Sequence, residues 1–146
     1  MIMADIFYNK TVTVYNRYVD DITEKETWYP TVLQNVHLLI NKGANVSKSG
    51  TDSADAAKLF VKPVFLTSDR KTYCMPKEWQ ALTNEDKVKH FTFTSADDFF
   101  VEGDTTTEEV LEDDFFSYMK QKYDNCFKIT NADKYDLIPH FEVGGA

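Results

Sequence analysis

The chain has few of the residues that signal a covalent framework or a redox site. It holds two cysteines among 146 residues, Cys74 and Cys126, which lie far apart and form no Cys-x-x-Cys pair. We expect both to behave as small buried hydrophobic residues in a reduced compartment. A chain of this length can bury a sizeable core without disulfides or metals, and it fits a single domain over residues 1–146.

Long apolar runs are also missing. Residues 1–5 lack the basic region and the apolar run of a signal peptide. No stretch approaches the ~20 apolar residues that are needed to span a bilayer. The sequence therefore predicts a protein that is made in a cytoplasm, stays there or is assembled from there, and has no membrane partner.

The signatures of common catalytic sites are absent from the sequence. There is no Gly-x-Ser-x-Gly elbow, no phosphate-cradling glycine loop and no dinucleotide fingerprint. His37, His90 and His140 are widely separated in strand-like contexts, which favours structural roles over zinc binding. We therefore expect neither an enzyme nor a cofactor. Asp98, Glu102 and His140 are the least poor catalytic candidates.

One group of carboxylates raises the question of a metal site. Asp98, Glu102 and Asp104 could line one side of a strand and its following turn, and oxygen-rich clusters bind Ca²⁺ or Mg²⁺. However, the Asp-x-Asp-x-Asp-Gly loop is missing, and a segment this acidic brings carboxylates together by chance. We expect no metal.

The net charge of −8 is concentrated in one segment. Nine acidic residues and no Lys or Arg lie between residues 97 and 114, while the rest of the chain holds 15 acidic and 16 basic residues. Such a segment repels nucleic-acid phosphates and favours a basic partner, although a solvated face is the more usual role of a charge run. Its candidate acidic interface is Glu108, Glu109, Glu112 and Asp113.

Aromatic and β-branched residues dominate the rest of the chain, with 11 Phe and 8 Tyr. This composition and the alternation of apolar with polar residues are typical of strands. We expect a mainly β (α+β) fold, in which Pro30 marks an edge or a bulge because proline cannot donate a ladder hydrogen bond. The expected strands cover residues 11–18, 27–40, 58–66, 90–94, 99–102, 125–130 and 138–143.

Two helices are expected. The longer one covers residues 107–122, where Thr105 and Glu108, or Thr106 and Glu109, have capping-box spacing and apolar residues recur at helical intervals. Acids crowd its start and lysines its end, which suits the helix dipole. A short helical turn is expected over residues 77–82, after Pro76.

Residues 41–57 differ in kind from their surroundings. They have almost no large apolar side chain, so they cannot bury enough surface to order themselves alone. Long loops in compact domains are functional or disordered, which leaves a binding loop that orders on assembly and a mobile insertion equally open. The candidate assembly residues are Lys42, Asn45, Lys48, Ser49 and Asp52.

The order of the short motifs resembles the small neck proteins of tailed bacteriophages and prophages, of the head-closure, head–tail adaptor or minor-capsid type. The resemblance spans most of the chain. The motifs that carry it are Val12-Thr13-Val14-Tyr15-Asn16-Arg17, Trp28-Tyr29-Pro30-Thr31-Val32, Lys58-Leu59-Phe60-Val61, Phe91-Thr92-Phe93, Asp98-Phe99-Phe100-Val101-Glu102-Gly103-Asp104, Phe127-Lys128-Ile129-Thr130-Asn131 and Pro139-His140-Phe141-Glu142-Val143.

This resemblance implies a small antiparallel β-barrel (a sandwich being the other arrangement open to these strands) that joins a ring at the portal vertex of the virion. Its implied partners are further copies of itself, the portal or adaptor protein, the tail-side neck proteins and, without sequence preference, the packaged DNA. The protein would be made in the cytoplasm of a host bacterium. The alternative is a non-structural acidic protein that mimics DNA or binds a basic partner.

Overall fold

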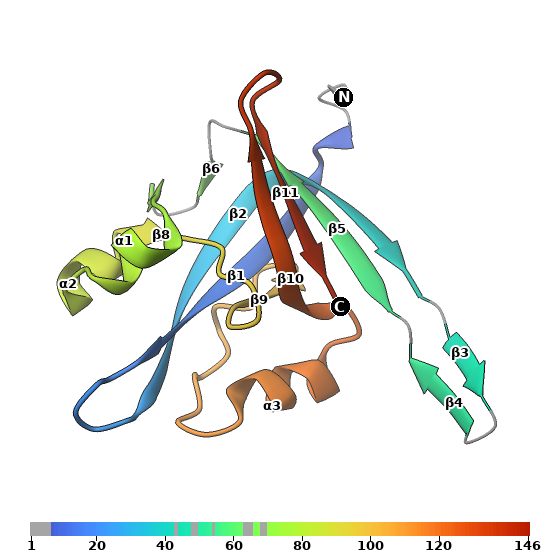
Figure 1. Ribbon diagram of the computed structural model, residues 1–146, viewed down its shortest axis with the longest axis horizontal. Coiled ribbons are helices and arrows are strands. Elements are labelled where there is room, and N and C mark those ends of the chain that lie inside the picture. Colours follow the sequence, from blue (N-terminus) through green and yellow to red (C-terminus); the bar gives the residue numbers. More distant parts are fainter. Residues whose placement is uncertain (1–6, 43, 48–49, 54, 63–65, 68–69) are drawn as a thin grey trace.

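The fold is a closed β-barrel of six antiparallel strands with three short helices outside it (Figure 1). The computed structural model describes residues 7–42, 44–47, 50–53, 55–62, 66–67 and 70–146. Its strands are β1 (Lys10–Val19), β2 (Glu26–Asn41), β3 (Ala44–Ser47), β4 (Gly50–Ser53), β5 (Ala56–Val61), β6 (Leu66–Thr67), β7 (Thr72–Tyr73), β8 (His90–Phe91), β9 (Phe99–Glu102), β10 (Cys126–Tyr135) and β11 (His140–Gly145). Its helices are α1 (Pro76–Gln80), α2 (Asn84–Lys87) and α3 (Phe115–Lys122).

The barrel closes because β2 is long enough to pair with two different strands. The order around the barrel is β1-β9-β10-β11-β5-β2, and β2 returns to β1. Strands β6, β7 and β8 lie outside this circuit, β6 beside β2 and the other two as a parallel pair. The predicted mainly β fold is therefore confirmed, and of the two predicted arrangements it is the barrel.

Strand β1 is buried on both of its faces. Val12 and Val14 point into the barrel, where they join the larger apolar cluster with Phe100 and Phe127. Tyr15 points outward into a second cluster, which α3 covers with Phe115 and Met119. Alternating residues of a strand point to opposite faces, so this run of apolar and hydroxyl side chains serves two cores at once.

Strand β2 changes partner halfway along its length. Its first half pairs with β1, and Pro30 lies there with a continuous neighbouring strand on one side only, which confirms the expected edge position. Its last five residues pair with β5. The bend between the two halves lies at Asn35, whose φ of 55° accompanies a register shift opposite Lys10 and Val12.

The longer helix begins later than the sequence predicts. It covers Phe115–Lys122 and not residues 107–122, and Asp114 just before it has a left-handed backbone with φ 53°. The Thr105 hydroxyl, which was expected to cap the helix, lies 2.6 Å from the Tyr15 hydroxyl, and the Thr105 N–H donates to Thr13. These tertiary hydrogen bonds use the capping groups and leave residues 107–114 as turns. The short helix after Pro76 is confirmed as α1.

Within residues 41–57, the described residues include the hairpin β3–β4, the last residue of β2 and the first two residues of β5. Figure 1 shows this hairpin, which we call the arm, projecting away from the barrel at the ends of β2 and β5. Its two strands pair with each other and with no other strand that the structure describes.

The C-terminal strand ends where the barrel leaves no room for a side chain. A Cβ atom on Gly145 would lie 2.8 Å from Cβ of Phe127 and 3.0 Å from the ring of Phe100. Both rings are fully buried, so neither has space to move away. Position 145 therefore requires glycine for packing reasons.

Replacing Gly145 with alanine is expected to lower the free energy of unfolding by about 1–3 kcal/mol, the usual effect of overpacking a core. Gly144→Ala is the matched control. Its Cβ would meet the amide oxygen of Asn131, which belongs to an exposed side chain that can turn aside. Urea unfolding compares the two variants, and equal losses would show that the Phe100–Phe127 contact is not the constraint.

Candidate functional site

A charged cleft of about 760 Å³ opens between the β1–β2 turn and the start of α3. Ala96 and Asp97 of the loop before β9 line it, as does Lys128 of β10. The remaining lining residues are Arg17, Val19, Glu24, Lys25, Glu26, Trp28, Glu112, Asp113, Asp114, Phe116 and Ser117. This lining brings the predicted acidic segment against a part of the chain nearly ninety residues away.

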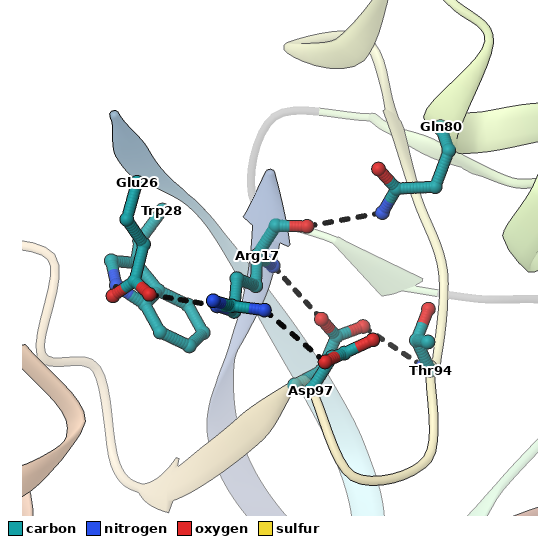
Figure 2. A network of polar contacts seen from close by, with 7 residues as sticks. Arg17, Glu26, Trp28, Gln80, Thr94 and Asp97 are labelled. Atoms are coloured by element: carbon teal, nitrogen blue, oxygen red, sulfur yellow. Dashed lines mark hydrogen bonds and ion pairs between the residues drawn. The ribbon is translucent and has the colours of Figure 1, made fainter. Parts of the chain in front are cut away.

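Arg17 organises one wall of the cleft (Figure 2). Its Nε donates to Glu26 at 2.8 Å, and its Nη1 lies 3.3 Å from a carboxylate oxygen of Asp97. Trp28 donates its indole N–H to the other oxygen of Glu26 at 2.8 Å. The hydrogen bond with Glu26 raises the pKa of Arg17. A guanidinium is always charged in proteins, and here the carboxylates of Glu26 and Asp97 balance that charge.

Asp98 lies fully buried behind that wall. Its carboxylate accepts 2.8 Å hydrogen bonds from the amide side chain of Asn16 and from the backbone N–H groups of Arg17 and Thr94. Burial raises the pKa of Asp98 to about 6, and the three donors oppose this effect. Asp98 thereby ties β1 to the loop before β9, and its role is structural.

The raised pKa predicts a pH dependence of stability. The folded protein holds the Asp98 proton up to about pH 6, whereas the unfolded chain releases it near 3.8. This group's contribution is therefore full below about pH 4 and is lost as the pH rises through about 6. Relative to Asp98→Asn, which does not titrate, the wild-type protein should lose about 3 kcal/mol between pH 4 and 7. Denaturant unfolding of both proteins at several pH values measures the free energy of unfolding of each. A wild-type protein that becomes more stable relative to Asp98→Asn as the pH rises would contradict the assignment.

The predicted acidic interface divides into two parts. Glu109, Glu112 and Asp113 are exposed, and the last two line the cleft with Asp114. None of these acids has a charged partner within the described ranges.

Glu108 does not belong with the other three acids. It is half-buried and accepts hydrogen bonds from Tyr118, Tyr123 and Lys122, and the Lys122 contact holds its pKa below the usual value. Its carboxylate is committed to holding the chain before α3 against that helix. That the four acids together form an interface stays a prediction.

The catalytic and metal candidates do not converge. Glu102 bonds to Asn125, and Asp104 accepts from the backbone and hydroxyl groups of Thr106 in a local turn. His140 lies near the tip of the β10–β11 hairpin beside Glu142, away from Asp98. Over the described parts of the chain, no group of three or more His, Cys, Asp or Glu side chains could hold a metal ion.

The cleft can recognise charged groups. Its described lining holds carboxylates, lysines, one arginine and one hydroxyl, that of Ser117, but no histidine or cysteine. Cys74 and Cys126 are both free and buried, and burial raises the pKa of Cys126 to about 12. The cleft can pair ionic groups and stack apolar ones against Trp28 and Phe116.

The candidate residues of the arm fall into three places. Lys42 lies at its base, where it donates to the backbone carbonyl of Asp124 and lies 3.4 Å from Asp55. Asn45 and Asp52 are directly paired across the hairpin. Lys48 and Ser49 lie outside the described residues.

Sequence reasoning missed the cleft itself. Arg17, Glu26 and Trp28 are brought together by the β1–β2 hairpin, whose register places Arg17 opposite Trp28. The expected strands at residues 11–18 and 27–40 leave a short polar stretch between them, so counting outward from its centre would have paired these residues. Nothing in the sequence indicates that Asp97 and residues 112–114 also line the cleft, because their place there depends on the closure of the barrel.

Comparisons with known proteins add a family but no activity. No curated protein and no solved structure matches the chain. Among the residues that the structure describes, no helix is long and apolar enough to cross a membrane. One family model matches residues 7–146, which includes every strand and helix of the fold. The chain therefore belongs to DUF6751, a family of unknown function.

Proposed function

We propose that the chain is a structural virion protein of the head–tail connector of a tailed bacteriophage, a ring-forming component of the neck. The observation that carries this proposal is the arm. Strands β3 and β4 leave the barrel as a separate two-stranded sheet, and such a ribbon is marginally stable unless it packs against something. A neighbouring subunit in a ring supplies such a surface.

The barrel supports the same reading. It is a small closed scaffold, which leaves β2 and β5 free to extend into the arm and β10 and β11 free to extend at the other end of the molecule. The acids of the charged cleft lie on the surface, where they keep packaged DNA from sticking if that surface faces the channel. Hairpins that project from a closed scaffold suit contacts with neighbouring subunits.

Peptide mass spectrometry on purified, DNA-filled particles from the source of the gene tests the proposal. A connector component should appear at a low, fixed ratio to the major capsid protein, and it should remain after the particles are washed in high salt. A chain that is abundant in the producing cells but missing from particles would overturn the virion assignment.

The exposed acids of the cleft favour one alternative, a non-structural module that binds a basic partner. Under this alternative, Glu112→Lys combined with Asp113→Lys should abolish capture of the partner and leave the oligomeric state unchanged. Glu85→Lys combined with Asp86→Lys, at two acids of α2 away from the cleft, is the matched control. Affinity capture from cells measures both pairs, and retained capture by the cleft pair would remove the alternative.

A further inference from the structure

A second pocket adjoins the charged cleft on the far side of Phe116 and has the opposite character. Its volume is about 570 Å³, and its apolar lining includes Phe116, Ile129 and the C-terminal Ala146. Thr130 closes one side of it. The pocket is open to solvent at the end of the barrel where β10 begins and β11 ends.

Two lysines give this pocket a basic rim. Lys128 lies with its ammonium group 4.5 Å from the centre of the Phe116 ring, and Lys120 donates to the backbone carbonyl of Cys126 at 2.6 Å. Neither lysine has a carboxylate partner in the part of the chain that the structure describes. An occupant with an apolar side chain and an adjacent acid would therefore match the pocket.

The chain itself presents such a group at the tip of the β10–β11 hairpin. Leu137 is 96% exposed there, and the side chain of its neighbour Asp136 is 88% exposed. We call Asp136 and Leu137 the tip. The acid beside Leu137 makes one charged contact among the described residues, with Lys134 at 3.8 Å.

Contacts between the two strands next to the turn hold the tip in place. The ring of His140 stacks on Tyr135 with 4.9 Å between ring centres and 9° between planes. Nδ1 of His140 lies 2.6 Å from the carbonyl oxygen of Ile138, and Nε2 lies 3.1 Å from Glu142. These contacts fix both strands next to the turn, so little conformational freedom is lost when the tip binds.

The tip and the pocket cannot meet within one chain. Ile129 and Tyr135 are six residues apart on the same strand, which places the pocket and the tip about 20 Å from each other along β10. A contact between them therefore requires two copies. The pairing is head to tail, and repeating it generates a ring or an open filament.

We propose that the tip of one copy inserts into the pocket of the next, with Leu137 on the apolar lining and Asp136 beside Lys120 and Lys128. This inference deepens the proposed function, on which it rests, by naming a contact between ring neighbours. One tip in one pocket buries far less area than a stable interface, so the isolated contact is weak and is completed by other contacts in the assembly.

Nuclear magnetic resonance at millimolar protein concentration detects such a weak contact. The sample mixes ¹⁵N-labelled wild-type protein with unlabelled Lys134→Cys protein that carries a nitroxide at the new cysteine. The native thiols are buried, so the nitroxide reports position 134. We expect broadening of the amide signals of Ile129, Thr130 and Ala146 in the labelled copy.

Leu137→Ser in the nitroxide copy should abolish that broadening, whereas Ile22→Ser should not. Ile22 is equally exposed, at 92%, but lies on the β1–β2 turn. Asp136→Lys in the nitroxide copy and Lys128→Glu in the labelled copy should each weaken the broadening, and the two together should restore it. Absent broadening, broadening on another surface, or broadening that survives Leu137→Ser would overturn the proposal.

The outcome separates this contact from the proposed function. If no broadening is seen although the chain is present in particles, the proposal of a neck protein is retained and the proposal of the tip–pocket contact is rejected. If the broadening appears although the chain is missing from particles, the protein self-associates through the tip but is not a virion component.

Discussion

Asp98→Ala should lower the free energy of unfolding by roughly 3 kcal/mol or more, since each buried donor that is left unpaired costs about 1–3 kcal/mol. The substitution removes the common acceptor of three donors, which come from Asn16, Arg17 and Thr94. Two of these are backbone N–H groups on different segments, and a methyl group leaves them no other partner. A typical domain has a free energy of unfolding of about 5–15 kcal/mol, so this loss is a large fraction of it.

The adjacent residue supplies the control. Asp97 is half-exposed, and its carboxylate makes a 3.3 Å contact with Arg17. Asp97→Ala should therefore change the free energy of unfolding by less than about 1 kcal/mol, the usual range for a surface ion pair. Denaturant unfolding of both variants at neutral pH, with unchanged slopes against denaturant, gives the comparison. Similar losses of stability at positions 97 and 98 would show that the buried hydrogen bonds of Asp98 do not account for the effect.

This network also illustrates where sequence reasoning stops. Asp98 was a candidate metal ligand because its spacing with Glu102 and Asp104 could place the three carboxylates along one side of a strand and the following turn. Its contacts depend on Asn16, which the pairing of β1 with β9 brings to it, and on Thr94 in the loop before β9. Nothing in the spacing of residues 98, 102 and 104 indicates those donors, so a structural acid looked like a site.

The barrel strands were the more predictable part of the fold. The β-branched and aromatic content of residues 11–18 indicated β1, and the missing N–H of Pro30 correctly indicated a half-edge in β2. Closure of the barrel was expected from the family resemblance and did not follow from any residue pattern. Local rules failed where tertiary contacts used the same groups, as at Thr105, whose hydroxyl bonds to Tyr15 instead of capping a helix.

The arm is the feature whose removal should have the largest effect on assembly. Strands β2 and β5 are paired up to Asn41 and Ala56, so Lys42 and Asp55 face each other at the base of the arm. Replacing residues 43–54 with Asn-Gly should close these strands with a two-residue turn of the type that hairpins favour. The described pairings of the barrel do not involve β3 or β4, so the variant should fold with the stability of the wild-type protein.

We expect this shortened protein to be absent from particles when it is the only copy supplied, because a ring neighbour would lose the ribbon that it holds. A second variant keeps the ribbon and changes Asn45, Lys48, Ser49 and Asp52 to alanine. Loss of incorporation in both variants would assign the contact to those side chains. Loss in the shortened variant alone would assign it to the backbone of the ribbon, which can add strands to a neighbouring sheet edge. Peptide mass spectrometry and particle infectivity measure both variants, and unchanged infectivity of the shortened protein would remove the arm from the assembly and, with it, the observation on which the connector proposal rests.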